Sequence, residues 1–120
     1  MANSALVIDD DKVTLELLTF QLESEGFGVT TAESGSAGLE LIKQKEFDVI
    51  LTDLHLPDVS GIGLVKSSKE LAPQTEIIMI TGDGSNDRAI EATKAGAFWY
   101  LEKPLDFAFR SLKANHQRNF

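Results

Sequence analysis

The chain contains no cysteine, which excludes disulfide bonds and metal sites built from thiolates. Long hydrophobic runs are also missing. The longest apolar runs, such as the one at residues 77–80, are only a few residues long, so we expect no membrane-spanning helix. Positive charge is scarce, because 11 Lys and Arg stand against 19 Asp and Glu and leave a net charge of -8. A negative net charge disfavours contact with the negatively charged phosphate backbone, so we expect no direct binding to nucleic acid.

The rest of the composition is that of an ordinary globular domain. Of the 120 residues, 42% are hydrophobic and 25% are charged, which is too apolar for a disordered chain. This length supports one hydrophobic core, so we expect a single domain over residues 1–120 without an effector domain. An acidic cluster lies within the first eleven residues with no basic segment before it, which argues against a signal peptide. Together with the lack of cysteine, this favours a cytoplasmic protein.

Two kinds of segment alternate along the chain. Five short segments are apolar or β-branched and bounded by turn or charged residues, as is typical of strands: 6–8, 29–32, 49–51, 77–80 and 98–101. Longer segments with helical spacing of apolar residues separate them, and a last helix is expected over residues 106–117. Strict alternation with apolar central strands predicts an α/β fold, a three-layer domain whose parallel sheet carries helices on both faces.

Residues suited to chemistry gather at the predicted carboxyl ends of the strands, where open parallel sheets place their functional crevice. They are Asp9, Asp10 and Asp11 after the first strand, Asp53 after the third, Thr81 after the fourth and Lys103 past the fifth. The second strand ends only in Glu33-Ser34-Gly35, as an edge strand would.

Carboxylates in such a group need a compensating cation. Two of them ~4 Å apart repel by roughly 4 kcal/mol at an effective dielectric near 20, and the single charge of Lys103 does not offset three. Oxygen ligands with room for water suit Mg²⁺. A divalent ion beside an exposed carboxylate, a hydroxyl and a lysine is an arrangement for phosphoryl transfer, in which the carboxylate attacks phosphorus.

Each of these residues also has a purely structural explanation. An aspartate after a strand is often a helix N-cap or a turn former, and for Asp11, just before a helical pattern, the N-cap is favoured. Thr81 is explained equally well as the last β-branched residue of its strand. A lone lysine before proline, such as Lys103, is usually a solvated loop residue, and a tyrosine such as Tyr100 is more often a core residue. The shared placement at the ends of four strands favours the functional explanation, because separate accidents would otherwise have to coincide.

With these motifs the chain resembles the receiver domain of bacterial two-component response regulators. Asp9 and Asp10 in LVIDDD match the acidic pair of that family, and Asp53 in LTDLHLPDVSG matches its phosphoacceptor. Thr81 in IIMITG matches the switch hydroxyl. In GAFWYLEKPLD, Tyr100 matches the switch aromatic residue and Lys103-Pro104 the lysine and proline, and this stretch is most similar to the nitrogen-regulatory branch.

The resemblance implies a flavodoxin-like fold, with five strands in the order 2-1-3-4-5 and five helices. It implies Mg²⁺, with Mn²⁺ as an alternative, held by Asp10, Asp53, the backbone carbonyl of His55 and, through water, Asp9. It also implies a cis peptide bond before Pro104.

The function that the resemblance implies is a phosphorylation-dependent switch rather than an enzyme. Asp53 would accept a phosphoryl group from a sensor histidine kinase or a histidine phosphotransfer protein. The hydroxyl of Thr81 and the ammonium of Lys103 would then bind phosphoryl oxygens while Tyr100 turns inward. The surface of the fourth helix, fifth strand and fifth helix would repack and control an output.

Three residues give this chain features of its own. His55 and Asp83 occupy two positions that in this family modulate loss of the phosphoryl group, two residues after the acceptor and two after the switch hydroxyl. Trp99 precedes the switch tyrosine. It has two explanations, ordinary strand packing or an aromatic anchor for a homodimer or another partner on the surface of the fourth and fifth helices.

Two other functions remain open. A phosphohydrolase of the haloacid dehalogenase type would use the loosely matching segment from Asp9 to Val13, with the covalent phosphate on Asp9 and Asp11 as acid and base. A pseudo-receiver would keep the fold as a binding module without phosphorylation. The residue that a phosphodonor labels distinguishes the three functions: Asp53, Asp9 or none.

Overall fold

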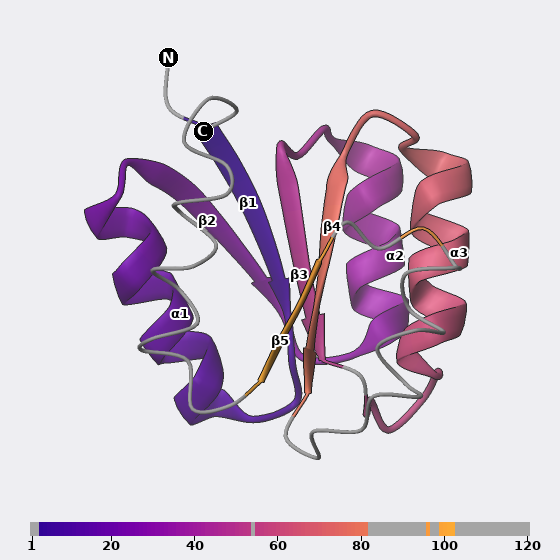
Figure 1. Cartoon of the computed structure of the whole chain (residues 1–120), viewed down its shortest axis with the longest axis horizontal. Helices are drawn as coiled ribbons and strands as arrows, with labels where there is room; N and C mark the ends of the chain where they lie inside the picture. Colours follow the sequence, from indigo (N-terminus) through magenta and orange to yellow (C-terminus); the bar gives the residue numbers. More distant parts are fainter. Residues whose placement is uncertain (1–2, 54, 82–95, 97–98, 103–120) are drawn as a thin grey trace.

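The structure, a computed structural model, describes residues 3–53, 55–81, 96 and 99–102 (Figure 1). The strands are β1 (Asn3–Ile8), β2 (Phe27–Ala32), β3 (Val49–Asp53), β4 (Glu76–Thr81) and β5 (Trp99–Glu102). The helices are α1 (Lys12–Ser24), α2 (Gly35–Gln44) and α3 (Gly61–Leu71). None of the helices described is both long and apolar enough to pass through a membrane.

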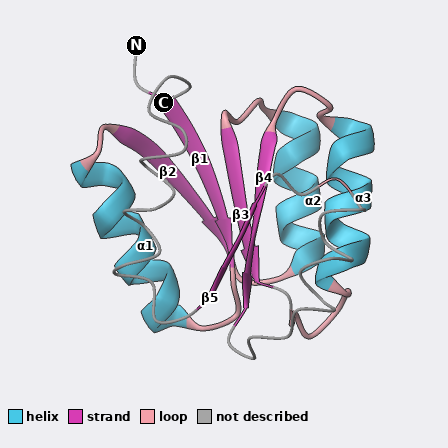
Figure 2. Ribbon diagram, viewed as in Figure 1, coloured by secondary structure: helices cyan, strands magenta, loops and turns pink. Residues whose placement is uncertain are grey.

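The strands form one parallel sheet in the order β2-β1-β3-β4-β5. Helix α1 covers one face of it, and α2 and α3 lie side by side on the other (Figure 2). The predicted α/β fold with a parallel sheet is therefore confirmed, and so is the edge position of the second strand. The observed strands extend past the predicted segments, because polar residues such as Asn3 and Ser4 also pair with the neighbouring strand. Phe98 and the predicted helix over residues 106–117 lie outside the described residues.

The core consists of two apolar layers, one on each face of the sheet. Successive residues of each central strand contribute in turn to one layer and to the other. In β1, Ala5 and Val7 pack in the layer that contains Leu18 of α1, whereas Leu6 and Ile8 pack in the layer that contains Leu64 of α3. Because both faces of β1, β3 and β4 are covered, these strands read as continuous apolar runs rather than as alternating patterns.

Local sequence signals set the ends of α1. Asp11 is its N-cap, and its carboxylate accepts hydrogen bonds from the backbone N–H of Val13 (3.1 Å) and the hydroxyl of Thr14 (2.8 Å). Gly26 has a φ of 96°, a conformation that glycine adopts without strain, and it turns the chain into β2. The predicted N-cap role of Asp11 is confirmed.

Candidate functional site

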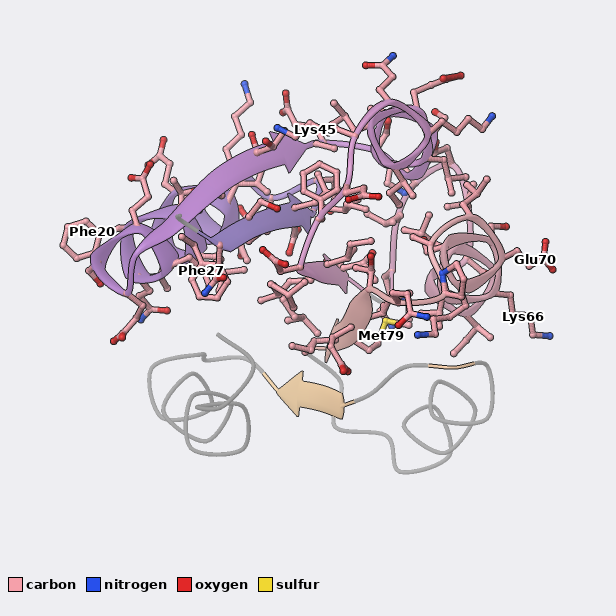
Figure 3. The ribbon with its side chains drawn as sticks, turned by 90° about the horizontal axis from the view of Figure 1, so that it is seen from above. Phe20, Phe27, Lys45, Lys66, Glu70 and Met79 are labelled. Carbon is pink, nitrogen blue, oxygen red and sulfur yellow. The ribbon has the colours of Figure 1, made fainter. Side chains whose placement is uncertain are left out.

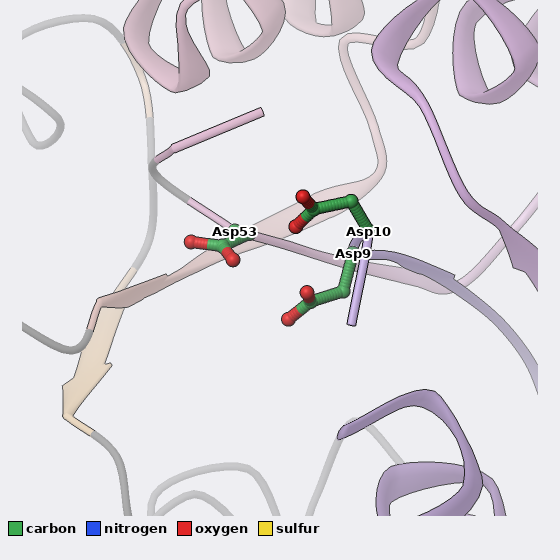
Figure 4. Close-up of side chains that lie close together, drawn as sticks. All are labelled: Asp9, Asp10 and Asp53. Atoms are coloured by element: carbon green, nitrogen blue, oxygen red, sulfur yellow. The ribbon is translucent and has the colours of Figure 1, made fainter. Parts of the chain in front are cut away.

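Three carboxylates meet at the carboxyl edge of the sheet (Figure 4). Strands β1 and β3 are neighbours, and Ile8 pairs with Thr52, so the next residue of each strand, Asp9 and Asp53, reaches the edge at the same level. Asp10 follows Asp9, and one carboxylate oxygen from each of the three aspartates lies within 4.8 Å of the others. The structure thus brings together the acidic residues that the sequence places after the first and third strands.

The three carboxylates differ in their exposure to solvent. Asp9 is fully buried and Asp53 is only 7% exposed, whereas Asp10 is exposed. The expectation of an exposed acceptor carboxylate is therefore wrong for Asp53. It is the last residue of β3, and that strand is buried along its whole length between β1 and β4. The nucleophile candidate lies inside the edge of the sheet rather than on its outer rim.

Backbone N–H groups orient the two buried carboxylates. Oδ1 of Asp9 accepts a hydrogen bond from the N–H of Asp11 (2.8 Å), and Oδ1 of Asp53 accepts one from the N–H of His55 (3.0 Å). Both bonds reach two residues along the chain, which is the pattern by which aspartate stabilises a turn. Each carboxylate is thus held by the turn that follows its own strand.

The donor set fits a hard divalent cation. It consists of oxygen atoms from three ionisable groups within 4.8 Å of one another, with neither sulfur nor imidazole in the set. Ions such as Mg²⁺ prefer such oxygen ligands and are commonly held through one or two carboxylates with water in the remaining positions. A cation at this place would also offset the repulsion between the carboxylates.

Asp58 is a functional candidate that the sequence pattern does not reveal. It lies in the loop between β3 and α3, and its carboxylate accepts hydrogen bonds from the N–H groups of Ser36 (2.9 Å) and Gly35 (2.9 Å) and from the hydroxyl of Ser36 (2.8 Å). These bonds, with the backbone N–H of Ser36 contributing most, lower the pKa of Asp58 to about 2. Its partners lie 22 and 23 residues earlier, and no periodic signal connects them.

The other predicted site residues lie on β4 and β5, which follow β3 in the sheet, or outside the described part. Thr81 ends β4, and because Asp53 pairs with Ile80, the backbone of Thr81 reaches the edge of the sheet beside the end of β3. Trp99 and Tyr100 lie in β5, paired with Ile78 and Met79. The predictions for Asp83, Lys103 and Pro104 fall outside the described residues.

Comparison with known proteins gives a consistent result. The family model of the response regulator receiver domain matches residues 5–113. The chain is 43% identical over 102 residues to the response regulator protein PilR of Pseudomonas aeruginosa. This alignment covers 85% of the chain but 23% of PilR, so the chain spans less than a third of the length of that relative.

Two solved structures resemble the chain over nearly its whole length. One is a response regulator protein from Burkholderia pseudomallei with a phosphorylated aspartic acid, a calcium ion and citrate, and it matches with a TM-score of 0.85 and 34% identity over 97% of this chain and 69% of that one. The other is the beryllofluoride-activated NtrC4 receiver domain dimer, with a TM-score of 0.87 and 34% identity over 98% of each chain.

The lowered pKa of Asp58 predicts a pH-dependent contribution to stability. A carboxylate with a lowered pKa in the folded state stabilises the fold above the pKa of an unfolded aspartate, about 3.9, and loses this effect as the pH falls towards the folded value. We therefore expect Asp58→Asn to lower the urea midpoint at neutral pH, with a deficit that narrows as the pH falls below about 4. Unfolding followed by circular dichroism tests this. A deficit that stays constant in acid would contradict it.

Proposed function

This chain belongs to the family of response regulator receiver domains, in the nitrogen-regulatory-like branch, and we propose that it is a phosphorylation-dependent switch whose phosphoacceptor is Asp53. The observation that carries the proposal is the grouping of Asp9, Asp10 and Asp53 at the carboxyl edge of the sheet in a chain of this family. We propose that residues 1–120 act as one cytoplasmic receiver domain with the family's five strands and five helices. As a signalling domain, it would perform only the chemistry of its own phosphorylation and dephosphorylation.

In the proposed reaction a carboxylate oxygen of Asp53 attacks the phosphorus atom of a phosphohistidine on a kinase or phosphotransfer protein. A phosphorus–oxygen bond forms, the phosphorus–nitrogen bond breaks, and the imidazole of the donor takes up a proton. The hydrogen bond from the N–H of His55 to Oδ1 of Asp53 holds the carboxylate in one orientation before the attack.

We assign the metal site to Asp10, Asp53 and the backbone carbonyl of His55, with Asp9 acting through water. Mg²⁺ is the proposed ion and Mn²⁺ the alternative, because the donor set is made of oxygen atoms. When bound, such an ion supplies positive charge to the transferring phosphoryl oxygens. The carboxylates would position the ion, and their oxygen atoms would favour hard cations over thiophilic ones.

The remaining assignments follow from the family resemblance. Thr81 and Lys103 would bind phosphoryl oxygens, Tyr100 would turn inward, and the peptide bond before Pro104 would be cis. The surface of the fourth helix, β5 and the fifth helix would then change and control the output. Trp99 would contribute to a homodimer through that surface. The dimer formed by the activated NtrC4 receiver domain supports dimerisation only.

Two residues are proposed to set how long the phosphoryl group persists. His55 follows the acceptor by two positions and is exposed, and Asp83 follows the switch hydroxyl by two positions. An imidazole at position 55 would shield the acyl phosphate from water, and a carboxylate at position 83 would orient or repel the attacking water.

The two rival functions are not favoured. The phosphohydrolase needs Asp11 as acid and base, but the carboxylate of Asp11 caps α1 through Val13 and Thr14. The pseudo-receiver needs no acidic group, yet three carboxylates converge at the edge of the sheet. The match of the receiver family model over residues 5–113 also supports the switch.

The outer face of α1 is a suitable docking surface for the phosphodonor protein. Val13 and Phe20 are 72% and 73% exposed, and Leu17 between them is also exposed. Phe20 points away from the sheet (Figure 3), and an open groove between α1 and β2 lies beside it. These three residues share a helix face that begins next to the acidic site, so a helix laid on it would reach Asp53 with its phosphohistidine.

The first test of the proposed function is Asp53→Asn. We expect this variant to take up no phosphoryl group from a small phosphodonor such as acetyl phosphate with Mg²⁺, because the amide is not a nucleophile for phosphorus. Mass spectrometry measures the gain of mass, and peptide mapping of the unaltered chain locates it. Label that persists in the variant, or that maps to Asp9, would overturn the assignment.

Metal binding should stabilise the fold. A ligand at 100 times its Kd stabilises by about 2.7 kcal/mol, so Mg²⁺ should raise the Tm of the unaltered chain. In Asp10→Asn we expect most of this rise to be lost, and the metal-free Tm to be equal or higher because one repelling charge is removed. Glu33→Gln, an exposed acid after β2 and outside the acidic group, is the control and should respond to Mg²⁺ like the unaltered chain. Equal Mg²⁺ responses in all three chains would exclude this metal site.

The docking surface predicts a difference between two kinds of donor. The donor is a phosphorylated histidine phosphotransfer protein that labels the unaltered chain. Phe20→Ser should lower the rate of transfer from this donor about tenfold or more, since an aromatic anchor contributes on the order of 2 kcal/mol. Labelling by acetyl phosphate should be unchanged. Leu71→Ser, an exposed residue at the far end of α3, serves as the matched control. Equal effects of Phe20→Ser on both donors would contradict docking at this face.

A further inference from the structure

The loop between β3 and α3 is fastened to a helix that precedes it in the chain. Three hydrogen bonds, of 2.8 to 2.9 Å, join the carboxylate of Asp58 to Gly35 and Ser36 in the first turn of α2. The same loop contains His55, whose backbone carbonyl is a proposed metal ligand. We propose that Asp58 is a positioning residue for phosphoryl transfer, which fixes the β3–α3 loop against α2 and thereby holds the His55 carbonyl in place. This inference rests on the proposed function.

The bonds to Asp58 complete the hydrogen bonding at the start of α2. An α-helix begins with four N–H groups that lack partners within the helix. Here the N–H groups of Gly35 and Ser36 donate to Asp58 and that of Ala37 to the side chain of Ser34, while Gly38 makes the first regular helical bond, to the backbone carbonyl of Ser34. A negative charge at this end of a helix is also favoured by the helix dipole. The first turn of α2 therefore favours one position of the Asp58 carboxylate.

Apolar packing brings the loop and the helix close together at the same place. A Cβ atom at Gly35 would overlap the side chain of Val59, the residue after Asp58. Val59 also packs against the core layer beneath α2 and α3. The loop tip is thus held by a polar contact on one side and an apolar contact on the other, so it cannot shift along α2 without breaking one of them.

The start of the loop is fixed to the acidic site. The N–H of His55 donates to Asp53, and His55 and Ser60 form an isolated antiparallel bridge that closes the loop. Ser60 in turn caps α3 by accepting a hydrogen bond from Gly63 (3.0 Å). Asp58 lies within the closed turn, so loss of its bonds would release the tip while the bridge remains. We therefore expect only a small shift of the His55 carbonyl and weaker binding of the metal, rather than loss of the site.

The test is calorimetric titration of Mg²⁺ alone into the full chain. Loss of a group that orients a metal ligand commonly weakens binding by roughly 10- to 100-fold; because Asp58 acts through the loop, we expect Asp58→Ala to raise the Kd about three- to tenfold. At saturating Mg²⁺ the rate of labelling by acetyl phosphate should return to within about twofold of the unaltered chain. Asp58→Asn keeps one acceptor oxygen, so its Kd for Mg²⁺ should lie between those of Asp58→Ala and the unaltered chain. It also provides a milder variant if Asp58→Ala does not fold.

Two controls separate positioning from general destabilisation. Asp48 is another exposed aspartate whose carboxylate accepts a backbone hydrogen bond, from Ser4 (2.7 Å), but it lies at the opposite edge of the sheet. Asp48→Ala should lower stability and leave the Kd for Mg²⁺ unchanged. Ser36→Ala removes the hydroxyl donor only and should change the Kd by less than about twofold, because the two backbone bonds to Asp58 remain.

The outcomes distinguish this inference from the proposed function. A raised Kd for Mg²⁺ in Asp58→Ala, with an unchanged Kd in Asp48→Ala, supports the positioning role. An unchanged Kd in Asp58→Ala, or the same increase in Asp48→Ala, overturns it and leaves the proposed function intact. Absence of both Mg²⁺ binding and labelling in the unaltered chain would overturn the proposed function and this inference together.

Discussion

The repulsion among three carboxylates is the constraint on which the rest of the site depends. Asp9 and Asp53 cannot move apart, because Ile8 and Thr52 are paired in adjacent parallel strands and both strands are buried on both faces. The apolar layers on the two faces of the sheet therefore stabilise an acidic arrangement that is unfavourable by itself. Burial of β1 and β3 provides the free energy that holds the charges together. A cation, or a phosphoryl group with its cation, would then bind to a site that is already assembled.

Local hydrogen bonds make this arrangement rigid as well as close. Each buried carboxylate accepts a bond from a backbone N–H two residues further along, at Asp11 and at His55. Side chains oriented in this way lose little conformational entropy when a ligand binds, which is the physical meaning of a preorganised site. The same bonds extend the site into the following segments, since Asp11 begins α1 and His55 begins the loop that leads to α3.

Much of this arrangement could be predicted from sequence because it depends on signals that are local or periodic. Apolar runs at residues 49–51 and 77–80 identify buried strands, and parallel topology then places the residues that follow them at one edge. The N-cap at Asp11 and the turn at Gly26 are also local signals. The burial of Asp53 was not predicted, because whether a residue at the end of a strand is covered depends on how far its neighbours extend. The partners of Asp58 were missed because they are distant in sequence and carry no periodic pattern.

The helices on the two faces of the sheet are connected to the acidic site in different ways. On one face, α1 is joined to Asp9 through the short segment that contains its N-cap, and its outer surface carries exposed apolar residues such as Phe20. On the other face, α2 and the β3–α3 loop are joined to each other by Asp58, and the loop is joined to Asp53 through His55. A partner bound to α1 would therefore act on the site from the side of Asp9. A displacement of α2 would act on it from the side of Asp53, because the charged bonds of Asp58 connect the helix to the loop more stiffly than apolar contact alone would.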